Sequence, residues 1–125
     1  MILVDTSVWI DHFRRGDGLL VELLQRADVI THPFVIGEIA CGNLRNRSST
    51  LELLQDLPVA VVADEPEVLA FIDSCVLHGK GVGYVDVHLL ASVALTDRTK
   101  LWTRDKKLRV VAEAMGCAFA DPMAH

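Results

Sequence analysis

The sequence predicts an α/β fold organised on a parallel sheet. Short, mostly apolar runs at residues 2–4, 29–30 and 101–103 each precede a segment with helical spacing. Their lack of polar alternation is typical of strands that a parallel sheet buries on both faces. Acids stand at the ends of two of these runs, Asp5 directly after the first and Asp105 after Arg104. Because open α/β sheets bind ligands at the carboxyl ends of their strands, both acids are candidates for chemistry.

Length and composition indicate a single domain over residues 1–125, long enough to bury a real core. No apolar run approaches the ~20 residues that span a bilayer, and the first residues lack the features of a secretory signal. We therefore expect a cytoplasmic protein without a membrane role. Cys41, Cys75 and Cys117 lie in apolar surroundings without a Cys-x-x-Cys pair, so we expect buried, reduced thiols and no zinc site.

The charge balance argues against binding of nucleic acid through bulk positive charge. The chain has 12 Lys and Arg against 17 Asp and Glu, which gives a net charge of −5. The basic residues are nevertheless unevenly distributed. One group consists of Arg45 and Arg47, and a denser one of Lys100, Arg104, Lys106, Lys107 and Arg109. A solvated helix face is the alternative explanation for both groups.

The first third of the chain predicts helices at residues 7–15 and 19–27, the first of which ends at Gly16. Thr31 and Pro33 then form a helix-start signal.

The helix that follows, at residues 34–41, is apolar nearly all round, so we expect it to be buried with Glu38 in its middle. A buried carboxylate needs a partner, because an isolated buried charge is costly. The partner is a metal ion or, alternatively, Arg45 or Arg47 in a salt bridge.

The middle of the chain predicts a helix at 48–57, a buried strand at 59–62 and a helix at 66–77. Asp64 and Glu67 fit a capping box, so we interpret them as helix-start residues. The inward side chains of this last helix are expected to be Val68, Leu69, Phe71, Ile72, Val76 and Leu77.

A glycine-rich connection at residues 79–83 precedes an apolar helix at 84–95. Its spacing matches neither the dinucleotide fingerprint nor the P-loop, so we interpret it as a mobile connection. Asp86 lies in the first turn of the helix, where capping is an alternative to a role in a site. His88 lacks a histidine or cysteine four residues on and is interpreted as a packed or surface residue.

The last part of the chain predicts a helix at 106–115, a weak edge strand at 118–120 and a frayed end at 124–125. Asp105 therefore repeats the order of strand, acid and helix seen at Asp5. Helix capping is the alternative explanation for an acid in this position.

Taken in order, the acids and their neighbours resemble the PIN-domain ribonucleases and, more narrowly, the VapC toxins of VapBC toxin-antitoxin modules. The resemblance covers essentially the whole chain and depends on the ordered set rather than on one motif. The matching segments are Asp5-Thr6-Ser7, Pro33-Phe-Val-Ile-Gly-Glu38, Val85-Asp86-x-His-Leu-Leu-Ala91 and Leu101-Trp-Thr103-Arg-Asp105-x-x-Leu108. This resemblance implies a PIN-like three-layer α/β/α sandwich with a central, mostly parallel sheet of four or five strands.

The resemblance also implies a metal-dependent endoribonuclease that is the toxin of a type II toxin-antitoxin system. In that family the matching acids bind Mg²⁺ or Mn²⁺; here they are Asp5, Glu38, Asp86 and Asp105. The hydroxyls that match Thr6 and Thr103 assist the site. The implied partners are an RNA substrate, a second copy of the chain in a homodimer, and a VapB-like antitoxin that presents a basic side chain to the acids.

The chemistry of the acids fits this activity independently of any family. Carboxylates without soft ligands suit hard cations, and one or two such ions can activate water and stabilise a pentacovalent phosphate. Asp5 and Asp105 are the expected primary ligands, with Glu38 and Asp86 completing the shell. The candidates to hold RNA phosphates are Arg45, Arg104 and Lys106.

Rival interpretations come from other classes of protein. A phosphoacceptor signalling domain needs a phosphorylatable Asp after its third strand, where this chain has Ala63. A haloacid-dehalogenase-like phosphatase needs an acid at the position of Ser7. A non-catalytic PIN-like RNA-binding or interaction module stays open, although the presence of all four acids argues against it.

Overall fold

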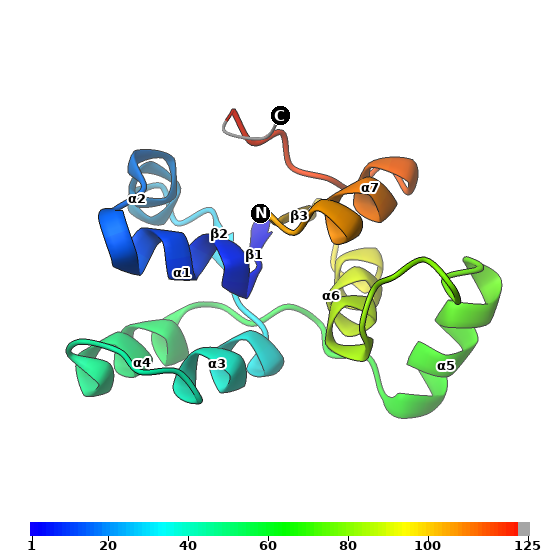
Figure 1. Cartoon of the computed structure of the whole chain (residues 1–125), viewed down its shortest axis with the longest axis horizontal. Coiled ribbons are helices and arrows are strands. Elements are labelled where there is room, and N and C mark those ends of the chain that lie inside the picture. The colour runs from blue at the N-terminus through cyan, green and yellow to red at the C-terminus, as the bar shows by residue number, and fades with distance from the viewer. Residues whose placement is uncertain (123–125) are drawn as a thin grey trace.

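The computed structural model describes residues 1–122, which form a small parallel sheet with helices around it (Figure 1). The strands are β1 (Ile2–Val4), β2 (Val29–Ile30) and β3 (Lys100–Trp102), in the spatial order β2-β1-β3. β1 pairs in parallel with both neighbours, so Leu3 lies between Ile30 and Leu101. The first strand of the chain is thus the centre of the sheet, and the predicted α/β fold is confirmed.

The helices are α1 (Thr6–Arg15), α2 (Gly18–Gln25), α3 (Pro33–Ala40), α4 (Arg47–Asp56), α5 (Glu65–Ser74), α6 (Tyr84–Leu95) and α7 (Lys106–Ala114). Every predicted helix forms; α6 has the predicted bounds, and the ends of the others differ from the prediction by at most three residues. α3 packs against α1 and α4, whereas α6 packs against α5 and β3. In Figure 1, α1 to α4 gather to the left of the strands and α5 to α7 to the right.

The sheet has fewer strands than expected in the described residues. The strands predicted at 59–62 and 118–120 are reduced to single parallel bridges at the two edges of the sheet, Thr31 with Val59 and Leu101 with Ala118. The segment 59–62 was expected to be a buried strand, but Val59, Val61 and Val62 are about half exposed. Within residues 1–122, the segment bonds to the sheet around Thr31 alone and buries Ala60 but not its valines.

The core lies where the strands meet the inner sides of the helices. Its fully buried large side chains include Leu3, Trp9, Leu20, Ile39, Leu54, Leu89, Leu90, Trp102 and Leu108. The side chains expected to point inward from the helix at 66–77 are only partly buried. Val68 and Leu77 are buried, but Leu69 and Val76 are 52% and 53% exposed. The reason is that α5 packs mainly against α6 and leaves its other side open.

The cysteines also differ from the expectation of buried thiols, because Cys41 and Cys75 are exposed and Cys117 is half-buried. Cys41 and Cys75 are the C-caps of α3 and α5, positions at which the chain leaves a helix at the surface. A search of residues 1–122 finds no helix of the length and apolar character that crossing a bilayer requires. Residues 124–125, expected to fray, lie outside the described part of the chain.

Candidate active site

Asp5 and Asp105 follow the neighbouring strands β1 and β3 and begin α1 and α7. Each is the N-cap of its helix: an Asp5 oxygen accepts the Ser7 N–H, and Asp105 Oδ1 accepts the Leu108 N–H at 3.0 Å. The capping explanation is therefore correct for both. Because parallel strands end at the same edge, capping also brings the two carboxylates to one edge of the sheet.

Hydroxyl groups connect these two acids. Thr103 Oγ1 donates to Asp5 Oδ2 at 2.8 Å and accepts the Asp105 N–H at 3.0 Å. Ser7 Oγ donates to the same Asp5 oxygen at 2.6 Å and accepts the Arg104 N–H at 3.0 Å. Asp5 is 7% exposed, so these donors compensate for the water that it loses. Sequence reasoning overlooked Ser7, although its place two residues after a capping aspartate was a signal.

Glu38 is not buried, contrary to expectation. Only Val35 and Ile39, on one side of α3, are buried, and the exposed Glu38 accepts a hydrogen bond from Thr6 Oγ1 at 2.8 Å. The alternative of a salt bridge is also wrong within residues 1–122, since no ion pair of Glu38 forms there and Arg47 instead bonds the Ala40 carbonyl. The Thr6 contact holds Glu38 beside the start of α1.

Asp86 brings the fourth carboxylate from the first turn of α6, where its Oδ2 accepts the Gly83 N–H at 3.0 Å. Burial raises the pKa of Asp86, and the charges of Asp5, Asp105 and Glu38 raise it further against the opposing effect of the Gly83 bond. Charge effects are largely screened beyond about 10 Å, so the four carboxylates share one region. They come from four separate elements around the carboxyl edge of the sheet.

The donor set fits a hard divalent cation. It consists of carboxylate oxygens, and mutual repulsion of the kind seen at Asp86 is what a bound cation would relieve. Within residues 1–122, however, no three His, Cys, Asp or Glu side chains converge as tightly as the ligands of one ion. Acids that surround a shared space can nevertheless reach one ion through small side-chain movements or through water.

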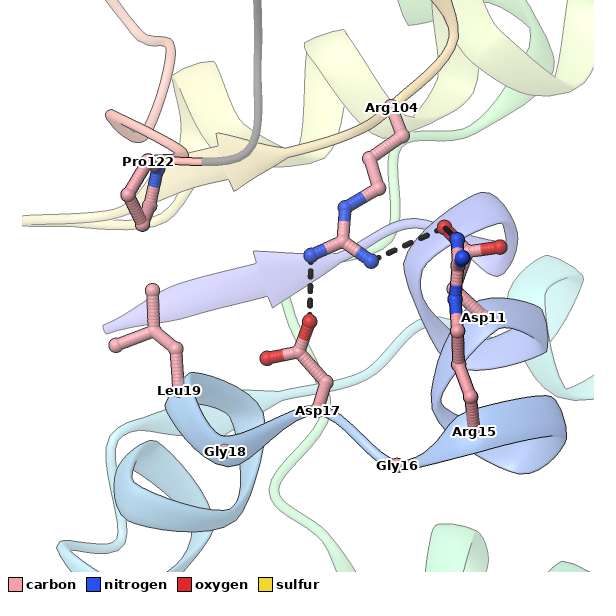
Figure 2. Close-up of a pocket in the computed structure, with 8 residues that line it drawn as sticks. All are labelled: Asp11, Arg15, Gly16, Asp17, Gly18, Leu19, Arg104 and Pro122. Carbon is pink, nitrogen blue, oxygen red and sulfur yellow. Dashed lines mark hydrogen bonds and ion pairs between the residues drawn. The ribbon is translucent and has the colours of Figure 1, made fainter.

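Arg104, expected among the residues that hold RNA phosphates, lies in a different environment (Figure 2). Its guanidinium forms ion pairs with Asp11, Asp17 and Asp121 and is only 16% exposed. Burial alone would raise the pKa of Asp17, but hydrogen bonds from Arg104 and the α2 backbone lower it. Because its donors already pair with three carboxylates, Arg104 links α1, the start of α2 and the C-terminal segment. We refer to Arg104, Asp11, Asp17 and Asp121 as the Arg104 cluster. Arg45 and Lys106 are exposed.

The cavity that Figure 2 shows lies at the Arg104 cluster and not among the four acids. It has a volume of about 350 Å³ and is lined by Arg104, Asp11 and Asp17 together with Arg15, Gly16, Gly18, Leu19 and Pro122. Of the acids after the strands, Asp105 is exposed at the carboxyl edge and Asp5 is buried beside it.

Comparison with known proteins identifies the family of the chain. A family model described as PIN domain matches residues 2–114. Two curated proteins, both named Ribonuclease VapC32, from Mycobacterium tuberculosis strains CDC 1551 / Oshkosh and ATCC 25618 / H37Rv, are each 45% identical over 124 residues. The alignment covers 99% of this chain and 100% of each relative. The chain therefore belongs to the PIN-domain family and, within it, to the VapC group.

Proposed function

We propose that this protein is a metal-dependent endoribonuclease and the toxin of a type II toxin-antitoxin system. The observation that carries the proposal is the hydrogen bonding that joins Asp5 to Asp105 through Thr103 and holds Glu38 on Thr6 at the start of the same helix α1. The pKa of Asp86, raised by burial and by the charges of these three acids, supports it. Full-length similarity to proteins named as ribonucleases supports it.

Asp5 and Asp105 are the proposed primary ligands of Mg²⁺ or Mn²⁺, and Glu38 and Asp86 complete the site directly or through water. Such ions, when bound, supply Lewis-acid chemistry that activates water and stabilises charge on a phosphate. The protein's own contribution is to hold the carboxylates in place. Thr103 and Ser7 orient Asp5 by hydrogen bonds, and Thr6 orients Glu38 in the same way.

Substrate binding needs groups outside the acids. Lys106 follows Asp105 at the start of α7 and is exposed, so it is a proposed contact for an RNA phosphate. Arg45, also exposed, lies in the connection between α3 and α4 and is the second proposed contact. Arg104 is left out because its cation is already paired.

The proposed protein partners are a VapB-like antitoxin and a second copy of the chain, in the cytoplasm. A region rich in carboxylates attracts a cationic side chain by charge-assisted hydrogen bonds, which supports inhibition by a basic antitoxin residue. Exposed apolar side chains around α5 and α6, including Val61, Leu69 and Leu95, support a homodimer. We expect a dimer mass in solution that Leu69→Glu reduces to that of a monomer.

The proposal is tested with antitoxin-free protein and RNA in Mg²⁺, Mn²⁺, Ca²⁺ or EDTA. We expect cleavage in Mg²⁺ and Mn²⁺, little in Ca²⁺ and none in EDTA. Asp5→Asn should remove cleavage. Asp64→Asn, which alters an acid that caps α5, should not. Cleavage that EDTA does not reduce would refute the metal mechanism. Absence of cleavage by folded, metal-supplied protein on any RNA would favour a non-catalytic PIN-like binding module.

A further inference from the structure

Aromatic rings from α3 and α6 form a continuous array close to the candidate ligands. The His88 ring lies at its centre, with its centroid 4.6 Å from that of Phe34 and 4.6 Å from that of Tyr84. Both neighbours meet it edge to face, at interplanar angles of 64° and 88°. His32 continues the array behind Phe34, at a centroid distance of 5.1 Å. Such edge-to-face contacts fix the orientation of each ring.

The array is buried at its base and open at its outer rings. His32 and His88 are 0% and 5% exposed, whereas Phe34 and Tyr84 are 36% and 49% exposed. A single exposed aromatic ring on a soluble protein requires no special explanation. Two exposed rings that pack against one buried imidazole differ from that case. Their orientations are already restricted, so a ligand that stacks on them loses little entropy in ordering them.

The array lies beside the acids. Phe34 precedes Glu38 by four residues on α3, so the two share one side of that helix. Tyr84 begins α6 in the same turn as Asp86. The exposed rings and two of the four carboxylates are therefore carried by the same two helices, α3 and α6.

The two buried imidazoles at the base of the array also have polar atoms without partners among the described residues. His88 Nδ1 and His32 Nε2 are buried, and within residues 1–122 neither has a hydrogen-bond partner. The exposed rings of Phe34 and Tyr84 offer a phosphate no charged partner, whereas their faces suit a flat ring.

We infer that Phe34, Tyr84 and His88 form a stacking platform for an unpaired nucleobase next to the phosphate that is cut. This inference rests on the proposed ribonuclease function. Single-stranded RNA is recognised by stacking of splayed bases on aromatic side chains, and every base has a face suited to it. A chain with a net charge of −5 gains little from bulk attraction to phosphate, so stacking is a suitable source of affinity.

The first test compares Tyr84→Ala and Tyr84→Phe in steady-state cleavage of a single-stranded RNA oligonucleotide that the wild type cuts. Loss of one stacking ring should raise KM between about fivefold and a hundredfold, with a smaller change in kcat. Tyr84→Phe should retain the wild-type KM. Val21→Ala is the matched control, because it removes an apolar side chain of α2 that is 40% exposed and belongs to neither the site nor the proposed dimer surface.

A second test needs no variant to fold. The oligonucleotide is made with an abasic nucleotide at each position beside the cut in turn. One abasic position should raise the wild-type KM by a factor similar to that of Tyr84→Ala, and the two changes combined should cost little more than either alone.

The outcomes separate the two proposals. If the wild type cuts no RNA, both are overturned. If it cuts and Tyr84→Ala behaves as Val21→Ala does, with no abasic position affecting KM, the platform is refuted and the ribonuclease function stands. If Tyr84→Ala weakens inhibition by an antitoxin peptide without changing RNA cleavage, the rings belong to a protein-binding surface and the inference is wrong.

Discussion

Asp105 combines two roles that a pair of substitutions can separate. Its Oδ1 caps α7 by accepting the Leu108 N–H at 3.0 Å, and its charge contributes to the raised pKa of Asp86. Asp105→Asn keeps an oxygen for the cap but removes the charge, because Asn and Asp cap helices about equally well. Asp105→Ala removes both the cap and the charge. The first change therefore tests the site alone, and the second tests the site and the scaffold together.

The expected magnitudes follow from these contacts. Loss of an N-cap costs about 1 kcal/mol, so Asp105→Ala should lower the melting temperature by about 4 °C. Asp105→Asn has two opposing effects on stability, each less than about 1 kcal/mol. It removes the attraction between a negative charge and the N-terminus of α7, and it relieves the repulsion from Asp86. The asparagine variant should therefore melt within about 2 °C of the wild type in EDTA. Both variants should lose RNA cleavage.

Asp64 provides the matched control for the cap. Its Oδ1 accepts the Glu67 N–H at 2.8 Å at the start of α5, and its charge is not among those that affect Asp86. Asp64→Ala should lose about the same stability as Asp105→Ala but keep cleavage. Thermal melts in EDTA and cleavage assays in Mn²⁺ provide both readouts. Wild-type cleavage by Asp105→Asn would refute its place in the site, and equal melting losses in Asp105→Asn and Asp105→Ala would refute the capping argument.

Glu38→Gln should abolish cleavage but keep the melting temperature in EDTA within about 2 °C, because an exposed amide oxygen can still accept from Thr6; a drop of ten degrees would contradict this. Arg104→Met should lower the free energy of unfolding by about 3 kcal/mol in urea titrations, since three carboxylates lose their cation. A decrease in the free energy of unfolding below about 1 kcal/mol would show that the ion pairs of Arg104 do not stabilise the fold. His32 has a pKa of about 4 in the folded protein against 6.5 when unfolded, so its neutral form stabilises the fold fully above pH 6.5. The free energy of unfolding should fall by up to about 3 kcal/mol as the pH drops from 6.5 toward 4. His32→Asn keeps an acceptor for the Phe34 N–H and should flatten this dependence; parallel curves for variant and wild type would refute it.

Several features of the fold were determined by local sequence. The order of apolar run, acid and helix places Asp5 and Asp105 at strand ends, because a buried strand must stop where polar residues begin and a helix must start with its N–H groups satisfied. Asp64 and Glu67 form the capping box that their spacing predicts. These features depend on neighbours within a few residues, so the sequence alone contains the relevant interactions.

The buried side of α3 was decided by tertiary structure. The helix is apolar nearly all round, and such a pattern has no period that distinguishes an inner side from an outer one. Packing against α1 and α4 buries Val35 and Ile39 and leaves Glu38 at the surface beside Thr6. A continuous apolar pattern therefore predicted the helix correctly and the burial of its acid wrongly.

The contacts of Arg104 and the aromatic array also required the folded chain. Arg104 meets carboxylates from α1, from the start of α2 and from the C-terminal segment, the farthest of them 93 residues away in the sequence. His32 and Phe34 meet His88 across more than fifty residues. No local spacing encodes these distances. The sequence determined which residues stand at the ends of strands and helices, whereas the parallel pairing of β1 with its neighbours decided which of those ends meet.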